Sequence, residues 1–280
     1  MRRRTQTVDS NVRISYLEDG DGPTLVCLPG WSQAAVQYSA FIDHFAPRHH
    51  VVAVDHRGHG ASSDPGSGYH LHRLAADLEA LLTALGIERA TFVGHSMGVA
   101  VLWAYLDVFG DRRVDRLVFN DSRPALLHNP HWTPADAEAC GGTMEATAMF
   151  DLCAALRATD GWNTHVGVMR HMVSRDLPEA RFEALLETNR ATTGETRAAL
   201  WLDQCGVDWR DVIRNVRRPT LVVHGLGSMI PTPSQQWVAD VIPGARLASI
   251  PAENGGSHFA FWENPTAFHA IVETFLAEAD

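Results

Sequence analysis

The chain has 280 residues, of which 45% are hydrophobic and 20% are charged, with a formal net charge of −10. This length and composition allow a sizeable buried core, which excludes a disordered or a collagen-like protein. Every basic residue is an arginine, so mechanisms that need a Schiff-base or P-loop lysine are excluded. Because the chain is acidic and has no basic cluster, we expect no nucleic-acid partner.

Several features bear on the compartment of the protein. No apolar run approaches the roughly 20 residues that cross a bilayer, so we expect no membrane partner. Residues 1–4 are basic, but polar residues follow where a signal peptide would carry its apolar stretch. The four cysteines are far apart, which indicates reduced thiols and not a disulfide framework or a zinc site. The sequence therefore predicts a cytoplasmic protein.

Short β-branched runs alternate with longer helical patterns, which is typical of a parallel sheet with crossover helices. The predicted strands, in chain order, are residues 12–17, 24–28, 51–54, 90–93, 116–120, 220–224 and 247–250. The helices predicted between and after them are residues 71–85, 99–108, 234–241 and 267–276. The pattern predicts an α/β fold with a mostly parallel sheet flanked by helices.

The pattern changes between the fifth and sixth predicted strands. Strand signals disappear there, and helical stretches take over at residues 145–157, 163–173 and 178–188. An insertion of helices at this point predicts a lid over the carboxyl edge of the sheet, where open α/β sheets bind their ligands. We therefore divide the chain into a core domain of residues 1–123 and 216–280 and a helical cap of residues 124–215.

The strongest chemical signal is Gly94-His95-Ser96-Met97-Gly98, a G-x-S-x-G sequence between a predicted strand and a predicted helix. Glycines are needed at such a tight turn because side chains there would strike the neighbouring elements. The turn would hold the Ser96 hydroxyl above the sheet at the start of the helix. The alternative is an ordinary loop serine.

A serine of this kind needs a base, and His258 follows the last predicted strand, in Gly255-Gly256-Ser257-His258-Phe259. The order nucleophile, acid, histidine along the chain fits such folds. A surface loop histidine is the alternative for His258.

The acid is less obvious. In most proteins of this architecture the acid follows the strand that ends here at His224-Gly225, but residues 226–231 contain no carboxylate. Asp121 ends the preceding strand and can reach a histidine at the same edge of the sheet. A buried carboxylate facing one imidazole nitrogen fixes the tautomer and stabilises the imidazolium. We therefore assign Asp121 as the acid, with an N-cap or turn aspartate as the alternative.

Backbone amides supply the predicted oxyanion site. The N–H groups of Trp31, in the loop Pro29-Gly30-Trp31, and of Met97 are expected to converge where an oxygen anion develops. The Trp31 ring either stacks on a flat substrate or plugs the edge of the pocket. Gln33 either hydrogen-bonds the ligand or caps the loop.

The remaining histidines and tryptophans give weaker signals. Short histidine pairs lack an acidic partner at metal-ligand spacing, so we predict no metal site. His224 lies on an interior strand and is interpreted as a satisfied core residue. The lid tryptophans are expected to pack in the core, with Trp162 the candidate for lining the pocket.

These motifs, together with Asp55-His56-Arg57-Gly58-His59-Gly60, resemble those of α/β-hydrolase-fold proteins. Within that superfamily, Asp121, the Pro-Gly-Trp loop and the Gly-Gly-Ser-His-Phe segment resemble the cofactor-independent 3-hydroxy-4-quinolone 2,4-dioxygenases. Quinaldine-type members carry a histidine close after the tryptophan, where this chain has Gln33.

The resemblance implies an enzyme with no cofactor, whose partners are O₂ and a small aromatic substrate. His258, held by Asp121, would deprotonate the 3-hydroxyl group of the quinolone, and Ser96 would position the substrate. The products would be carbon monoxide and an N-acylanthranilate.

The rival function is a serine hydrolase acting on an ester or lactone, with Ser96 as nucleophile and His258 as base. A ligand receptor that retains the fold is a third possibility, but it would not need the complete Ser96, Asp121 and His258 set. The assembly is expected to be a monomer or a homodimer.

Overall fold

The computed structural model describes residues 1–9 and 11–278, and the predicted core ranges include residues 10 and 279–280, which lie outside the described residues. Eight strands form one sheet in the order β1-β2-β4-β3-β5-β6-β7-β8. The strands are β1 (Arg2–Asp9), β2 (Val12–Asp19), β3 (Thr24–Leu28), β4 (His50–Val54), β5 (Ala90–His95), β6 (Val114–Asn120), β7 (Thr220–Gly225) and β8 (Arg246–Ile250). The six strands from β3 to β8 pair in parallel, which confirms the predicted α/β class with a mostly parallel sheet.

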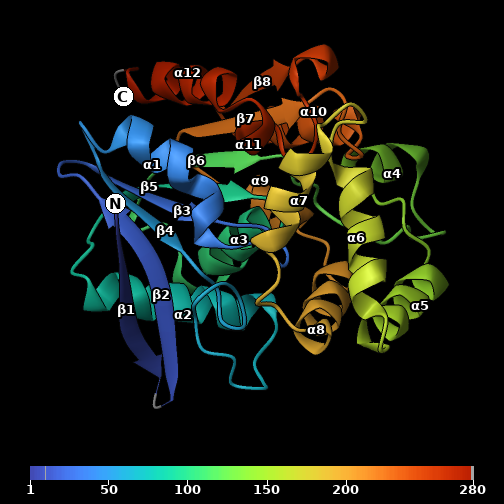
Figure 1. Ribbon diagram of the computed structural model, residues 1–280. Coiled ribbons are helices and arrows are strands. Elements are labelled where there is room, and N and C mark those ends of the chain that lie inside the picture. The colour runs from blue at the N-terminus through green and yellow to red at the C-terminus, as the bar shows by residue number, and fades with distance from the viewer. Residues whose placement is uncertain (10, 279–280) are drawn as a thin grey trace.

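Helices cover both faces of this sheet (Figure 1). Helices α1 and α12 pack together on one face, and α2 and α3 pack together on the other. The helices that border the sheet are α1 (Ser39–Phe45), α2 (Leu71–Ala84), α3 (Met97–Phe109), α10 (Thr232–Val241), α11 (Ala260–Glu263) and α12 (Pro265–Leu276). Strands β3, β4, β5 and β7 are almost wholly buried, because apolar side chains point to both helical layers.

The chain between β6 and β7 is helical, and most of its helices lie to one side of the sheet (Figure 1). These helices are α4 (Pro134–Cys140), α5 (Ala146–Arg157), α6 (Gly161–Met172), α7 (Glu179–Glu187), α8 (Gly194–Cys205) and α9 (Arg210–Arg214). The division at residues 124–215 into a separate cap stays a prediction. None of the described helices is long and apolar enough to span a bilayer.

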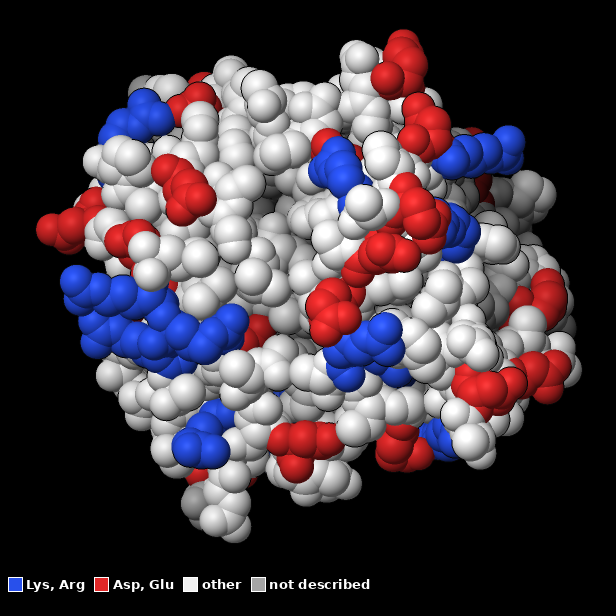
Figure 2. Space-filling model, in the orientation of Figure 1, with Lys and Arg blue, Asp and Glu red and all other residues white. Residues whose placement is uncertain are grey.

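Strand β1 was not expected from the sequence. Its residues RRRTQTVD are polar and mostly exposed, because β1 is the outermost strand of the sheet and pairs only with β2. Figure 2 shows arginine side chains gathered over the region where Figure 1 places the start of the chain. Charged side chains on an edge strand hinder further strand pairing, so the polar sequence suits this position.

Candidate active site

The turn at Ser96 has the geometry that the G-x-S-x-G motif predicts. Ser96 has φ 51° and ψ −120°, and it directly precedes α3. A Cβ atom on Gly98 would lie 2.2 Å from the carbonyl oxygen of Leu28, and one on Gly94 would lie 2.9 Å from the Val99 nitrogen. Both glycines are therefore required by close backbone approach.

Positive φ angles mark the site more broadly. Among the described residues other than glycine, only Ser32, Ser96 and Asp121 have positive φ, at 61°, 51° and 52°. Such conformations are unfavourable for residues with a side chain and persist only where the surrounding structure holds them. All three follow a strand or its loop at the carboxyl edge of the sheet, where ligands bind in open α/β sheets.

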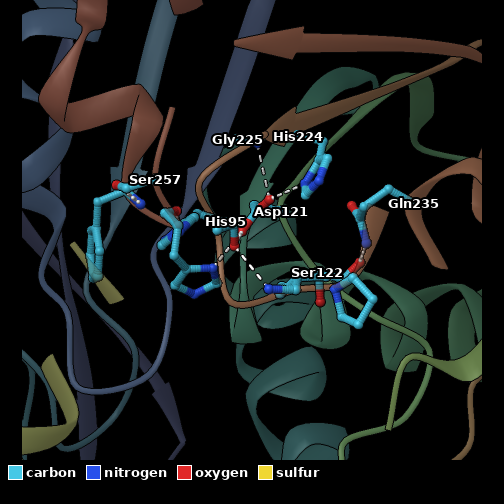
Figure 3. A network of polar contacts seen from close by, with 12 residues as sticks. His95, Asp121, Ser122, His224, Gly225, Gln235 and Ser257 are labelled. Carbon is cyan, nitrogen blue, oxygen red and sulfur yellow. Dashed lines mark hydrogen bonds and ion pairs between the residues drawn. The ribbon is translucent and has the colours of Figure 1, made fainter. Parts of the chain in front are cut away.

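Asp121 lies at the centre of a buried hydrogen-bond network (Figure 3). Its Oδ2 accepts hydrogen bonds from His258 Nδ1 at 2.6 Å and from Ser228 Oγ at 2.5 Å. Its Oδ1 accepts from His224 Nδ1 at 2.8 Å and from the Gly225 amide at 3.2 Å. An ionised carboxylate has about four lone-pair sites, so these four donors satisfy it.

The hydrogen bonds decide the charge of Asp121. Burial by itself raises the pKa of this carboxyl group, but the hydrogen bonds from His224 and His258 outweigh burial and hold the pKa of Asp121 well below its ordinary value. Asp121 is therefore a carboxylate at neutral pH. It holds a proton on His258 Nδ1, so Nε2 is the ring nitrogen that faces away from Asp121.

A second buried histidine supports the backbone of His258. His95 Nε2 lies 2.7 Å from the carbonyl oxygen of His258, and a carbonyl can only accept, so His95 donates there. Gln33 Oε1 accepts the Gly30 N–H at 3.0 Å, and the Gln33 side-chain amide lies beside His95 Nδ1. Burial and the neighbouring His258 lower the pKa of His95 to about 3.

A partly open cavity is lined by two of the predicted reactive residues, Ser96 and His258. Its polar lining comprises Gln33, Ser96, Ser122, Arg123, Gln204 and His258. Trp31, Trp201 and Trp209 line it with apolar neighbours, and Met97 borders it as well. The backbone N–H groups of Trp31 and Met97 have no hydrogen-bond partner within the described part of the chain, so both remain available to an oxygen anion.

Residues of the helical insertion between β6 and β7 hold the Trp31 loop in place. Trp31 Nε1 donates to the carbonyl oxygen of Arg197 at 2.8 Å. Ser32 Oγ donates to Asn189 Oδ1 at 3.3 Å, and Thr192 Oγ1 donates to the Ser32 carbonyl at 3.3 Å. Trp31 thus lines the cavity and also contacts the helical insertion, and its stacking on a substrate stays a prediction.

The structure places some predicted residues differently. Trp162 does not line the cavity, and the guanidinium groups of Arg190 and Arg197 lie 4.2 and 4.9 Å from the centroid of its ring. Trp201, in α8, lines the cavity instead. Gln33 lines the cavity too, but its oxygen accepts the backbone N–H of Gly30 in its own loop.

The sequence interpretation missed the roles of two residues at Asp121. His224, interpreted as a satisfied core residue, is indeed buried and paired, since its Nε2 contacts Thr232 Oγ1 at 2.9 Å, but its other nitrogen contacts Asp121. Ser228 stands in the loop where the acid usually lies. The pairing of the strands could have indicated both contacts. Because β6 and β7 are adjacent parallel strands, residues that follow their carboxyl ends lie close together.

No group of three or more His, Cys, Asp or Glu side chains within residues 1–9 and 11–278 is arranged to hold a metal ion. The cysteines Cys27, Cys140, Cys153 and Cys205 are all buried and free.

The model of the alpha/beta hydrolase fold family matches residues 23–265 of the chain. The chain belongs to this family. The chain is also similar to individual enzymes. The non-heme haloperoxidase of Rhodococcus erythropolis is 26% identical over 96% of this chain and 98% of that protein.

Two further relatives bear on the chemistry. The 2-heptyl-3-hydroxy-4-quinolone dioxygenase AqdC2 of Rhodococcus erythropolis is 36% identical over 40% of this chain and 43% of that protein. The structure of the esterase RhEst1 from Rhodococcus sp. ECU1013 superposes with a TM-score of 0.80, is 25% identical and covers all of both chains. The protein is therefore an enzyme of the α/β-hydrolase superfamily, and its relatives include both oxygenases and hydrolases.

Proposed function

We propose that the protein is a cofactor-independent dioxygenase that opens the ring of a 3-hydroxy-4(1H)-quinolone. The observation that carries this proposal is the state of His258. Its Nδ1 donates to the Asp121 carboxylate, and its Nε2 makes no hydrogen bond to Ser96 or to any other described residue. A histidine whose Nδ1 is held by a carboxylate and whose Nε2 makes no hydrogen bond to the protein is placed to take a proton from the substrate.

The lining of the cavity has the aromatic character that suits a flat aromatic substrate. Trp31, Trp201 and Trp209 line it, and the edge of the Trp201 ring system meets Trp31 at 4.9 Å between centroids. Aromatic faces and edges favour stacked or tilted contacts with a planar ring. The partial similarity to a quinolone dioxygenase supports the same substrate class.

The proposed reaction uses these groups in sequence. His258 removes the 3-hydroxyl proton, and the resulting anion reacts with O₂ at C2 to form a peroxide. The peroxide attacks C4, whose oxygen becomes negative and is stabilised by the Trp31 and Met97 amides. Collapse places one oxygen atom of O₂ on C2 and one on C4, and C3 leaves with its own oxygen as carbon monoxide.

A serine hydrolase acting on an ester or lactone is the second candidate. The strained backbone of Ser96, which presents its hydroxyl at the start of α3, favours it. The free amides of Trp31 and Met97 would then stabilise a tetrahedral intermediate formed at Ser96. The relationship to an esterase structure supports this candidate.

Two alanine variants separate the candidates. With a 3-hydroxy-4-quinolone, O₂ uptake and carbon monoxide release are measured in the presence of a chelator. We expect His258→Ala to lower kcat by about 10²–10⁴-fold, because general base catalysis is lost. We expect Ser96→Ala to retain appreciable turnover, because Ser96 only positions the substrate.

The same variants are assayed with p-nitrophenyl esters and lactones. Absence of O₂ uptake together with an esterase activity that Ser96→Ala abolishes would replace the dioxygenase by the hydrolase.

A further inference from the structure

Arg123 is a buried arginine on the cavity wall whose charge no acidic residue pairs. It follows Asp121 by two positions, is 5% exposed and lines the same cavity as Ser96 and His258. Across the described ranges, no carboxylate oxygen lies within 4 Å of its guanidinium group. Buried arginines are ordinarily paired, because an unpaired buried charge is costly.

The hydrogen bonds of Arg123 use only part of its guanidinium group. Nη1 donates to the Gly141 carbonyl at 2.9 Å and to Thr143 Oγ1 at 3.1 Å. Nε and Nη2 donate to no described residue. Neither of these two atoms is fully buried, so both keep some accessible surface. Because the side chain lines the cavity, these donors are open to a ligand there.

The surroundings do not neutralise the charge. Burial lowers the pKa of Arg123, and only Cys205 and Asp121 act in the opposite direction. Burial also raises the pKa of the Cys205 thiol to about 12, so this thiol is neutral near pH 7. Asp121 already accepts four hydrogen bonds from other groups.

Gln204 adds a second polar group to the same wall. It lies on α8, is 4% exposed and lines the cavity. The side-chain amide of Gln204 makes no hydrogen bond to a described residue. Neither its oxygen nor its nitrogen is fully buried, so both keep some accessible surface. A guanidinium edge and an amide facing one cavity offer several donors to a single anionic group.

We propose that Arg123, assisted by Gln204, binds a carboxylate of the substrate, so that the cavity accepts an aromatic acid and not only a neutral ring. This inference rests on the proposed function only in taking this cavity as the substrate site. If Arg123 served only to hydrogen-bond Gly141 and Thr143, a single uncharged donor group would be enough. The unpaired charge and the two open donors are explained when the counter-ion arrives with the ligand.

Calorimetric titration with quinoline-4-carboxylate and its neutral isostere quinoline-4-carboxamide tests the proposal without turnover. For the unmodified protein we expect the carboxylate to bind at least tenfold more tightly than the carboxamide. Equal affinities would overturn the proposal, and this comparison does not depend on any variant being folded.

Variants then locate the anion site. Arg123→Gln is expected to abolish the preference for the carboxylate, and Thr143→Val, which removes only a structural partner of Arg123, is expected to keep it. Arg89→Gln, at an exposed arginine paired with Asp115, is the charge-matched control and should behave like the unmodified protein. A preference that survives in folded Arg123→Gln would place the carboxylate at the Trp31 and Met97 amides and overturn the proposal.

Failure of this inference can be distinguished from failure of the proposed function. Carboxylate binding that depends on Arg123, combined with no O₂ uptake from any 3-hydroxy-4-quinolone, rejects the dioxygenase and leaves the anion site in place. Quinolone turnover combined with equal affinity for acid and amide rejects the anion site alone.

Discussion

At the scale of single residues, the site concentrates its constraints on Asp121. This residue has a positive φ, is fully buried and accepts hydrogen bonds from two imidazoles, one hydroxyl group and one backbone amide. A carboxamide at this position has one acceptor oxygen and a donor NH₂ group, so it could not accept from all four. The network therefore requires a carboxylate and fixes the tautomer of His258 through it.

Moving the acid to position 228, in the loop after β7, tests this network. Asp121→Asn is expected to lower kcat by about 10³-fold or more, because His258 loses the carboxylate that fixes its tautomer. Ser228 Oγ lies 2.5 Å from the same carboxylate oxygen that contacts His258 Nδ1. A carboxylate introduced by Ser228→Asp in the Asp121→Asn background is therefore expected to restore part of the activity.

The single variant Ser228→Asp is the control for this relocation. It places two carboxylates side by side in a buried site, so we expect a lower free energy of unfolding than in the double variant. Activities are compared by kcat and stabilities by urea denaturation. A double variant no more active than Asp121→Asn alone would contradict the assignment of the acid.

At the scale of secondary-structure elements, the close approach of α3 to β3 positions Ser96 and the Met97 amide. Gly98→Ala would place a Cβ atom 2.2 Å from the Leu28 carbonyl oxygen and 2.8 Å from the Pro29 carbonyl oxygen. Backbone atoms cannot move aside as a flexible side chain can. We expect a loss of about 3 kcal/mol or more in the free energy of unfolding.

A second helical glycine provides the matched comparison. A Cβ atom on Gly167, in α6, would meet nothing within 4 Å, so Gly167→Ala is expected to stabilise the protein by about 0.5–1 kcal/mol. Thermal and urea unfolding of both variants measure the difference. Similar stability of the two variants would show that the contact between α3 and β3 is looser than described.

The elements also show which parts of the molecule were predictable. The apolar runs of β3 to β7 were recognisable because buried parallel strands need continuous hydrophobic sequence. Strand β1 was missed because an edge strand is exposed and carries no such signal. Helices α4, α8 and α9 of the insertion were not singled out, since their patterns are short or interrupted by polar residues.

The candidate site likewise has features that the sequence predicted and features that it did not. The meeting of Asp121 with His258 follows from chain order, because the carboxyl ends of parallel strands share one edge. Other features of the site depend on the directions in which side chains point. These are the contact of His224 with Asp121, the presence of Trp201 and not Trp162 on the cavity wall, and the open donors of Arg123. Periodicity alone does not specify these directions.

At the scale of the whole molecule, a set of buried histidines couples stability to pH. Burial is the leading cause that lowers the pKa of His59, His95 and His165 to about 3, and that of His56 and His269 to about 4. In the unfolded chain these imidazoles titrate near pH 6.5. Below that pH the unfolded state binds protons that the folded state does not bind, so stability falls as the pH falls from about 6.5 towards 3–4.

His269 offers a test of this linkage away from the site. Its Nε2 is buried without a hydrogen-bond partner, and its ring contacts the rings of Phe41, His44 and Phe45 at 4.6–5.7 Å. His269→Phe therefore removes one titrating group without removing a hydrogen bond of Nε2.

Each histidine kept neutral contributes up to about 1.4 kcal/mol per pH unit to the slope of stability against pH. Urea unfolding between pH 6.5 and 5 is expected to show a slope smaller by up to one proton in His269→Phe, but unchanged in His131→Phe, at an exposed histidine. An equal slope in both variants would mean that His269 is protonated in the folded protein, and a buried neutral histidine could then not explain its acid sensitivity.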